Sequence, residues 1–121
     1  MSGKLLMFAF HSLPVIAAVN KTMAELGVEV IPVMPRDYKK PLQSLVDTTL
    51  NGEEYAGAPL GGPMLVLCEL KDRLEEVLPA LQRAGVGTDC LKAVLTTHNR
   101  KWNAVKLYGE LQQERMAMLG K

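Results

Sequence analysis

The amino-acid sequence predicts an α/β fold, in which a four-stranded sheet is built from two βαβ units and followed by a C-terminal helix. Two stretches, 4–10 and 64–68, are apolar throughout, as is typical of strands that are covered on both faces. Each is followed by an amphipathic helical pattern, which ends at a Gly-Val step and leads into another strand-like run. Because the two central strands need cover on both sides, we favour a parallel sheet of order 2-1-3-4. A ferredoxin-like α+β sheet is the alternative, if a dimer or the last helix covers its bare face.

The first βαβ unit spans residues 3–35. After its first strand, Ser12 is a suitable N-cap for a helix. Apolar residues then recur at three- and four-residue spacing until Gly27, which ends the helix. The second strand, 28–34, contains Pro32, which cannot donate a hydrogen bond to a neighbouring strand. This strand therefore belongs at an edge of the sheet.

A connecting segment spans residues 36–62. Pro41 suits the first position of a short helix, because its fixed φ is helical and its missing N–H needs no partner there. The stretch 51–63 is rich in Gly and Pro and shows no hydrophobic period. A loop of this length is either functional or mobile, and the sequence leaves both alternatives open.

The second βαβ unit spans residues 63–96. Its helical stripe is closed by Gly85, and its last strand carries Lys92, which suits an edge. A final helix is expected over residues 103–119, with Asn103 as its N-cap.

The two units resemble each other in sequence. An offset of 58 residues aligns Phe8 with Val66 and Gly27 with Gly85. An internal repeat explains this alignment, and so does the core pattern that any two strand–helix–strand units share. The βαβ interpretation holds in either case.

The composition excludes several classes of protein. The chain has 121 residues, which is the usual size of one domain, so we expect a single domain over residues 1–121. With 14 basic and 13 acidic side chains it has no net field to attract nucleic acid or an anionic membrane. Cys68 and Cys90 are too few for a disulfide scaffold, and residues 1–10 are too short for a signal peptide, so we expect neither. We therefore expect a cytoplasmic protein.

From residue 63 onward the sequence is similar to a known family. The matching stretches are 63–68, the amphipathic helix after it, 91–96, and the pair Asn99 and Trp102. They resemble the bacterial domain of unknown function numbered three-seven-eight-three, most strongly over residues 63–111. That family has no assigned activity. The resemblance therefore implies a small bacterial cytosolic domain and supplies neither a reaction nor a cofactor.

In a parallel sheet, ligands bind beyond the carboxyl ends of the strands, where the connections diverge. The predicted topology gathers polar side chains from the ends of the first, third and fourth strands at such a point. The candidate ligand-binding residues are His11, Ser12, Cys68, Glu69, Thr97, His98, Asn99 and Arg100. An anion could bind the helix N-terminus after Ser12 with help from Arg100. In the alternative, Ser12 only caps the helix and Arg100 is solvated.

The sequence carries no strong catalytic or cofactor motif. A thiol enzyme would pair Cys68 with His98, but a cysteine in an apolar strand is usually a core residue. We expect no metal, because the His and Cys residues lack close pairs such as C-x-x-C. We expect no dinucleotide cofactor either, since the first strand is not followed by G-x-G-x-x-G. Trp102 is expected to anchor the last helix rather than to stack on a base.

The preferred function is a non-catalytic module that binds a small molecule or a protein partner, and a homodimer is compatible with it. One alternative is an enzyme with a thiol-based site formed by Cys68 and His98. The other is a protein-interaction domain that uses its Met-rich C-terminal tail, residues Met116, Met118 and Leu119. Neither a nucleic-acid nor a membrane partner is expected.

Overall fold

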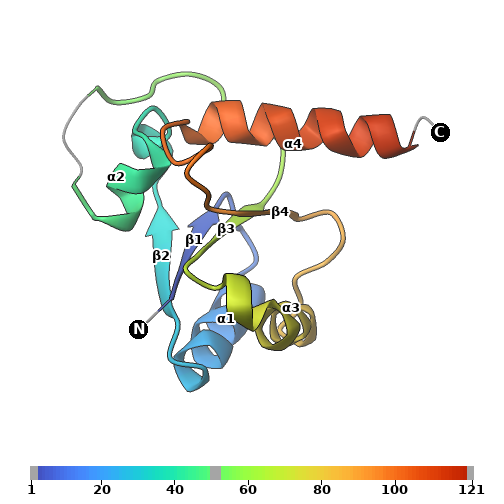
Figure 1. Cartoon of the computed structure of the whole chain (residues 1–121). Helices are drawn as coiled ribbons and strands as arrows, with labels where there is room; N and C mark the ends of the chain where they lie inside the picture. The colour runs from blue at the N-terminus through green and yellow to red at the C-terminus, as the bar shows by residue number, and fades with distance from the viewer. Residues whose placement is uncertain (1–2, 50–52, 120–121) are drawn as a thin grey trace.

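The computed structural model describes residues 3–49 and 53–119, with side chains described as far as Met116. Four strands and four α-helices follow one another, together with two short 3-10 turns (Figure 1). The order is β1 (Lys4–Phe8), α1 (Leu13–Glu25), β2 (Glu29–Val33), η1 (Pro35–Asp37), α2 (Leu42–Val46), β3 (Met64–Cys68), η2 (Lys71–Arg73), α3 (Leu74–Arg83), β4 (Leu91–Val94) and α4 (Ala104–Leu119). In the described part of the chain, no helix is both long and apolar enough to cross a membrane.

The strand order β2-β1-β3-β4 confirms the predicted order. The expectation that all four strands run parallel is wrong at the centre of the sheet. β1 is parallel to β2 and β3 is parallel to β4, but β1 and β3 are antiparallel, with Leu6 opposite Val66. The reason is the path of the connection after β2. It returns to the same edge of the sheet, where Met64 begins β3 beside Phe8 at the end of β1, so no crossover is needed.

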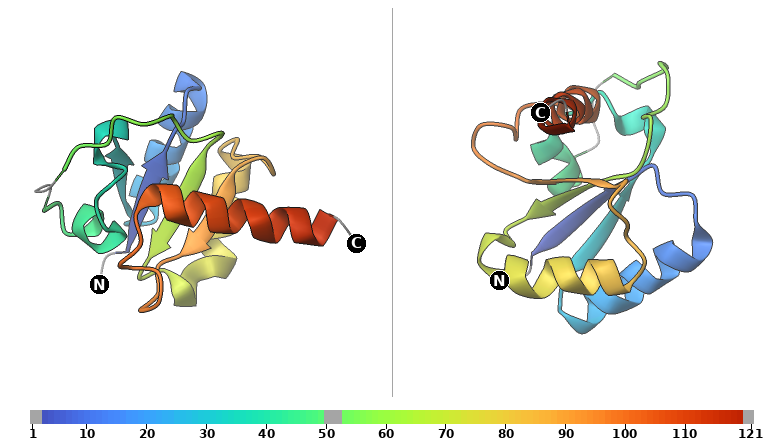
Figure 2. Two further views of the ribbon diagram at one scale, coloured as in Figure 1. Left: turned by 90° about the horizontal axis from the view of Figure 1, so that it is seen from above. Right: turned by 90° about the vertical axis from the view of Figure 1, so that its right-hand side faces the viewer.

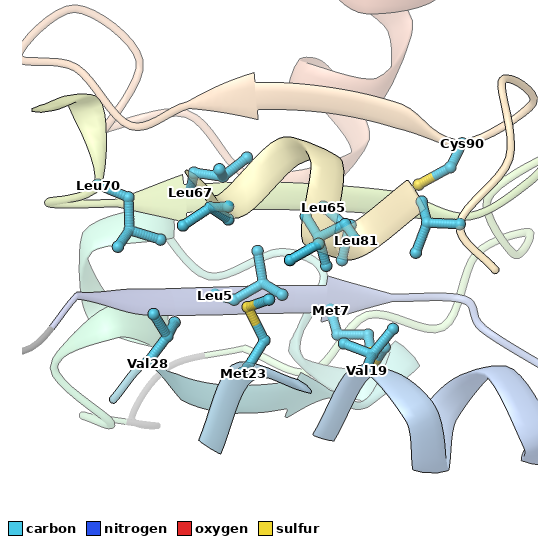
Figure 3. Packing of buried hydrophobic residues seen from close by; sticks show 13 residues of the cluster. Leu5, Met7, Val19, Met23, Val28, Leu65, Leu67, Leu70, Leu81 and Cys90 are labelled. Atoms are coloured by element: carbon cyan, nitrogen blue, oxygen red, sulfur yellow. The ribbon is translucent and has the colours of Figure 1, made fainter. Parts of the chain in front are cut away.

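Both faces of the sheet are covered, which explains why β1 and β3 are apolar throughout. α1 and α3 pack on one face, and α2 and α4 on the other (Figure 2). Alternate residues of the central strands enter the two cores. On the α1 and α3 side, Leu5 and Leu67 pack against helix residues such as Met23 (Figure 3). On the other side, Leu6 and Val66 pack against α2 and α4.

The two βαβ units are related by a pseudo-two-fold axis perpendicular to the sheet. Each begins with a five-residue strand that is followed by a left-handed non-glycine residue, Ala9 (φ 60°) in the first unit and Glu69 (φ 56°) in the second. Each helix is followed by a left-handed glycine, Gly27 (φ 73°) and Gly85 (φ 106°). The offset is 60 residues at Ala9 and Glu69 and 58 at the glycines, so the predicted alignment is two residues out of step in the strands. A two-residue step leaves every strand side chain on its proper face.

The predicted N-caps of the long helices are present. The Ser12 hydroxyl accepts a hydrogen bond from Val15 N at 3.5 Å, and the Asn103 side chain accepts one from Lys106 N at 2.9 Å. Two predictions fall partly outside the described residues. They concern residues 51 and 52 of the Gly- and Pro-rich loop, and the Met118 and Leu119 side chains of the tail.

Candidate functional site

The eight predicted site residues lie at the two opposite ends of the strands, which we call two edges of the sheet. His11 and Ser12 follow β1 at one edge. Cys68 and Glu69 end β3 at the other edge, where β4 also ends and leads into residues 97–100. The antiparallel pairing of β1 with β3 causes this separation, because the carboxyl ends of antiparallel strands point in opposite directions. The structure therefore offers two smaller groups of residues instead of one cluster.

At the edge where β4 ends, Asn99 completes the sheet. Its side-chain oxygen accepts a hydrogen bond from Thr96 N at 2.8 Å, and its side-chain nitrogen donates one to Val94 O at 3.1 Å. These are the two backbone groups that one residue of a neighbouring parallel strand would pair with through its own N–H and C=O. The Asn99 carboxamide takes the place of that residue at the end of β4, so its role is structural.

The same loop also holds two helices in place. Trp102 O accepts from Leu42 N at 2.8 Å and Arg100 O accepts from Gln43 N at 3.0 Å, so the loop carbonyls satisfy the first N–H groups of α2. The Trp102 ring lies under Lys106 Nζ of α4, which is 4.8 Å from its centroid. The segment with Asn99 and Trp102 thus joins β4, α2 and α4.

The remaining polar residues at this edge have local roles or face solvent. Thr96 Oγ1 accepts hydrogen bonds from His98 N at 3.2 Å and Asn99 N at 3.1 Å, which fixes the turn. The His98 ring packs edge-on against Trp102 at 5.2 Å between centroids. Glu69 and Thr97 are exposed.

The Cys68 thiol is poorly suited to nucleophilic chemistry. It is 1% exposed, and its Sγ donates to Val66 O at 3.7 Å. Burial raises the pKa of Cys68 to about 12, and the neighbouring Glu69 carboxylate raises it further than Lys4 lowers it. Burial likewise raises the pKa of Cys90 to about 11. Both thiols are therefore protonated near neutral pH, and because they belong to the cores on opposite faces of the sheet, they are not placed to pair.

The edge at the carboxyl end of β1 contains two adjoining hollows, separated by the segment Ala9, Phe10 and His11, which lines both. A further hollow of about 380 Å³ lies beside them between α3 and β4 and shares Val86 and Gly87 with the lining of the first. The first hollow has a volume of about 260 Å³ and opens toward β3 and β4. Besides the shared segment, its lining consists of Ser12, Val15, Pro63, Gly85, Val86, Gly87, Asp89 and Cys90. The second has a volume of about 240 Å³ and opens toward β2. Its further lining residues are Met7, Ile16, Pro32, Val33, Met34, Pro35, Tyr38 and Pro59.

The two hollows differ in chemistry. The first presents the polar side chains of His11, Ser12 and Asp89. Beyond His11, the second is lined by apolar side chains and Tyr38. Two large apolar side chains are exposed at this edge, Leu13 at 77% and Met34 at 55%. Exposed apolar side chains beside a hollow are typical of a binding site.

The helix N-terminus at this edge offers little to an anion. Pro14 has no N–H, and Val15 N already donates to the Ser12 hydroxyl. Only Leu13 N remains among the first three residues of α1. Arg100, the predicted second contact of an anion, follows β4 at the opposite edge. The anion interpretation therefore has no support from this geometry.

The pseudo-symmetry shows that the first hollow is specific to the first half of the chain. At the equivalent edge, Leu70 stands in the place of Phe10, is fully buried, and packs so closely over Gly3 that a Cβ there would collide with it. Arg73 stands in the place of Leu13, and its Nη2 donates to Leu26 O at 2.8 Å. Figure 3 shows Leu70 at one end of the core cluster and Cys90, which lines the first hollow, at the other. The position of the first hollow is therefore closed in the second half of the chain. A smaller hollow of about 190 Å³, whose lining includes Leu67, Leu74 and Val94, lies near the position equivalent to the second hollow.

Sequence reasoning found His11 and Ser12 but missed the residues opposite them. Asp89 precedes β4 and reaches this edge only because β3 runs antiparallel to β1, whereas Met34 follows β2, which is parallel to β1 and ends at the same edge. No residue pattern specified the direction of β3. Within residues 3–49 and 53–119, no three His, Cys, Asp or Glu side chains are grouped so that they could hold a metal ion.

Residues 63–118 match the family model described as "Domain of unknown function (DUF3783)". This confirms the family resemblance for the segment that contains β3, α3, β4 and α4. No curated protein and no solved structure matches the chain. The first hollow spans the boundary of the matched segment, since residues 9–12 precede it and residues 85–90 belong to it.

Proposed function

We propose that the protein is a non-catalytic binding module whose small ligand occupies the hollows at the carboxyl end of β1. One observation carries this proposal: the pseudo-symmetric position of the first hollow is filled by Leu70 and Arg73, whereas the first hollow itself is left open beside Phe10. Since the fold can close the edge with its own side chains, the opening is not a requirement of the topology. An exposed apolar residue such as Leu13 also costs solubility, which is tolerated where a ligand or partner covers it.

The lining favours binding over a reaction. Ligand sites are mostly apolar and carry a few polar groups that orient the ligand, and the two hollows together have this character. The thiol at the first hollow, Cys90, is protonated near neutral pH and donates its Sγ–H to Leu91 O at 3.5 Å. The Ser12 hydroxyl is engaged as a helix cap. Two free, buried cysteines also fit a reducing compartment, and we propose the cytoplasm as the location of the protein.

The proposal is tested with indole as a small aromatic probe and methyl NMR as the readout. We expect saturable chemical-shift changes for the Val15 and Met34 methyl groups, which lie in the two hollows. The methyl groups of Val105 and Met116, which are 39% and 72% exposed, serve as controls because they lie on α4 and line neither hollow. If the shifts follow exposure alone, so that Met116 responds as strongly as Met34, the proposal is wrong.

A variant that fills one hollow gives a matched control. Gly87 lines the first hollow, and a Cβ at this position would meet only the end of the flexible Asp89 side chain, at 2.9 Å. Gly87→Leu should therefore remove the response of Val15 and leave that of Met34 unchanged. Loss of both responses with an unchanged spectrum elsewhere would contradict the assignment of two hollows.

A second candidate function is protein interaction through α4, favoured by the exposure of Met116 at 72% and Val105 at 39%. Truncation after Arg115 removes the tail and keeps the hydrogen bond from Arg115 Nη2 to Thr88 O at 2.6 Å. Sedimentation of the full chain and of this variant should then show a loss of self-association. Equal sedimentation, with no association in either, would exclude a dimer formed by the tail.

A further inference from the structure

We infer that the two hollows form one continuous site for a single amphipathic molecule, and that Phe10 forms the movable partition between them. This inference rests on the proposed function and adds to it the number of ligands, the chemical class of the ligand and the residue that controls its access.

The two hollows share one wall. Ala9, Phe10 and His11 line both hollows, and the other lining residues are divided between the β3–β4 side and the β2 side. Each hollow, at about 260 and about 240 Å³, is smaller than the roughly 300 Å³ at which ligand sites begin. Joined, they offer about 500 Å³, which lies within the usual range of such sites.

The Phe10 partition is weakly held by the residues around it. Phe10 is only half-buried, whereas its pseudo-symmetric counterpart Leu70 is fully buried behind Gly3. Leu70 follows Glu69, with a φ of 56°, just as Phe10 follows Ala9, with a φ of 60°, so the two side chains differ in packing and not in the backbone before them. A ligand that displaces the Phe10 ring loses fewer packing contacts than one that would displace Leu70. A passage between the two hollows can therefore open by movement of Phe10, whereas Leu70 keeps the equivalent position in the second half closed.

The side chains that line the two hollows indicate the chemical class of the ligand. The polar side chains of His11, Ser12 and Asp89 are gathered in the first hollow, and the second is bounded largely by apolar side chains such as Met34. The Asp89 carboxylate is a hydrogen-bond acceptor, so it favours a ligand head that donates hydrogen bonds. The matching molecule has a donor head in the first hollow and a flat apolar tail in the second.

The experiment compares a long and a short probe. The long probe is 4-phenylbenzylamine, which has an amine head and a biphenyl tail, and the short probe is benzylamine, which has the same head. We expect the long probe to shift the Val15 and Met34 methyl groups with one common Kd at a 1:1 stoichiometry. We also expect it to bind at least tenfold more tightly than benzylamine, because only the long probe reaches the second hollow.

Variants of the partition give the second readout. Phe10→Leu should increase the affinity for 4-phenylbenzylamine about three- to tenfold and leave that for benzylamine unchanged. Phe10→Trp should weaken only the long probe, and the matched change Leu70→Met in the closed half should alter neither affinity. An unperturbed Leu78 methyl signal shows that each variant is folded.

The outcomes separate this inference from the proposed function. Different Kd values at Val15 and Met34, or two equivalents of the long probe per chain, would overturn the single site and leave a binding function intact. Benzylamine binding that the longer tail does not improve would do the same. If neither probe nor indole produces a saturable response at this edge, the inference and the proposed function both fail.

Discussion

Asn99 is expected to be among the most important polar residues for stability, because its side chain takes the place of one residue of a neighbouring strand. It is 9% exposed, and Asn99→Ala removes both its bond from Thr96 N and its bond to Val94 O. Each bond contributes about 1 kcal/mol, and a buried partner left without a bond costs about 1–3 kcal/mol. Thr96 is exposed and Val94 half-buried, so water recovers part of this loss. We therefore expect the free energy of unfolding to fall by about 2–3 kcal/mol. This is a large share of the total, which is about 5–15 kcal/mol for most domains.

Urea denaturation followed by Trp102 fluorescence measures the free energy of unfolding of each variant. The matched control is Asn103→Ala, which removes a single capping bond to Lys106 N and should cost about 1 kcal/mol. Asn99→Asp keeps an acceptor for Thr96 N but places a carboxylate oxygen against Val94 O, so it should cost at least as much as the alanine variant. If Asn99→Ala destabilises the protein no more than Asn103→Ala does, the argument that Asn99 takes the place of a strand residue is refuted.

Two further predictions concern the glycines and the buried thiol. Gly27→Ala should cost about 1 kcal/mol, because its φ is positive but no atom lies within 4 Å of the new Cβ. Gly85→Ala should cost at least about 1 kcal/mol more, since its Cβ would lie 3.2 Å from Val15 Cγ2, and equal losses in thermal denaturation would contradict this. Because the folded Cys68 pKa is raised to about 12, the unfolded chain loses this proton first, and stability should fall as pH rises above about 9. Urea titrations of wild type and Cys68→Ala should show their stability difference shrinking by up to about 1.4 kcal/mol per pH unit there, and a constant difference would exclude the linkage.

The strands and helices could be predicted because each leaves a local pattern. The apolar run of β3 was expected over 64–68 and is observed there, and the β1 run was expected two residues too long. Gly27 and Gly85 marked the helix ends correctly, since a left-handed residue after a helix is usually a glycine.

The direction of β3 could not be predicted from the same patterns. A continuously apolar strand indicates cover on both faces, and that cover is the same whether its neighbour is parallel or antiparallel. The direction depends on the path of the chain between Val33 and Met64, whose described residues contain the 3-10 turn η1, the five-residue helix α2 and much irregular backbone. The order of the strands was correct because it depends on burial, which the sequence does show.

The candidate site was predicted only in part, because part of it depends on the direction of β3. His11 and Ser12 were placed at the end of β1, where the first hollow lies. Asp89 completes the first hollow only through the direction of β3, whereas Met34 follows β2, whose parallel pairing with β1 was expected. Asn99 was recognised as part of a family pattern, but its strand-like pairing is a contact between one side chain and the backbone, which leaves no period in a sequence.

Xenon binding to crystals of the protein tests most directly the claim that the position of the first hollow is open in the first half of the fold and closed by Leu70 in the second. Xenon enters apolar cavities that have room for it and leaves packed regions empty. We predict xenon density in the hollows beside Phe10 and Met34, and none beside Leu70 and Arg73 at the pseudo-symmetric edge. Equal density at both edges, or density only beside Leu70, would contradict the account.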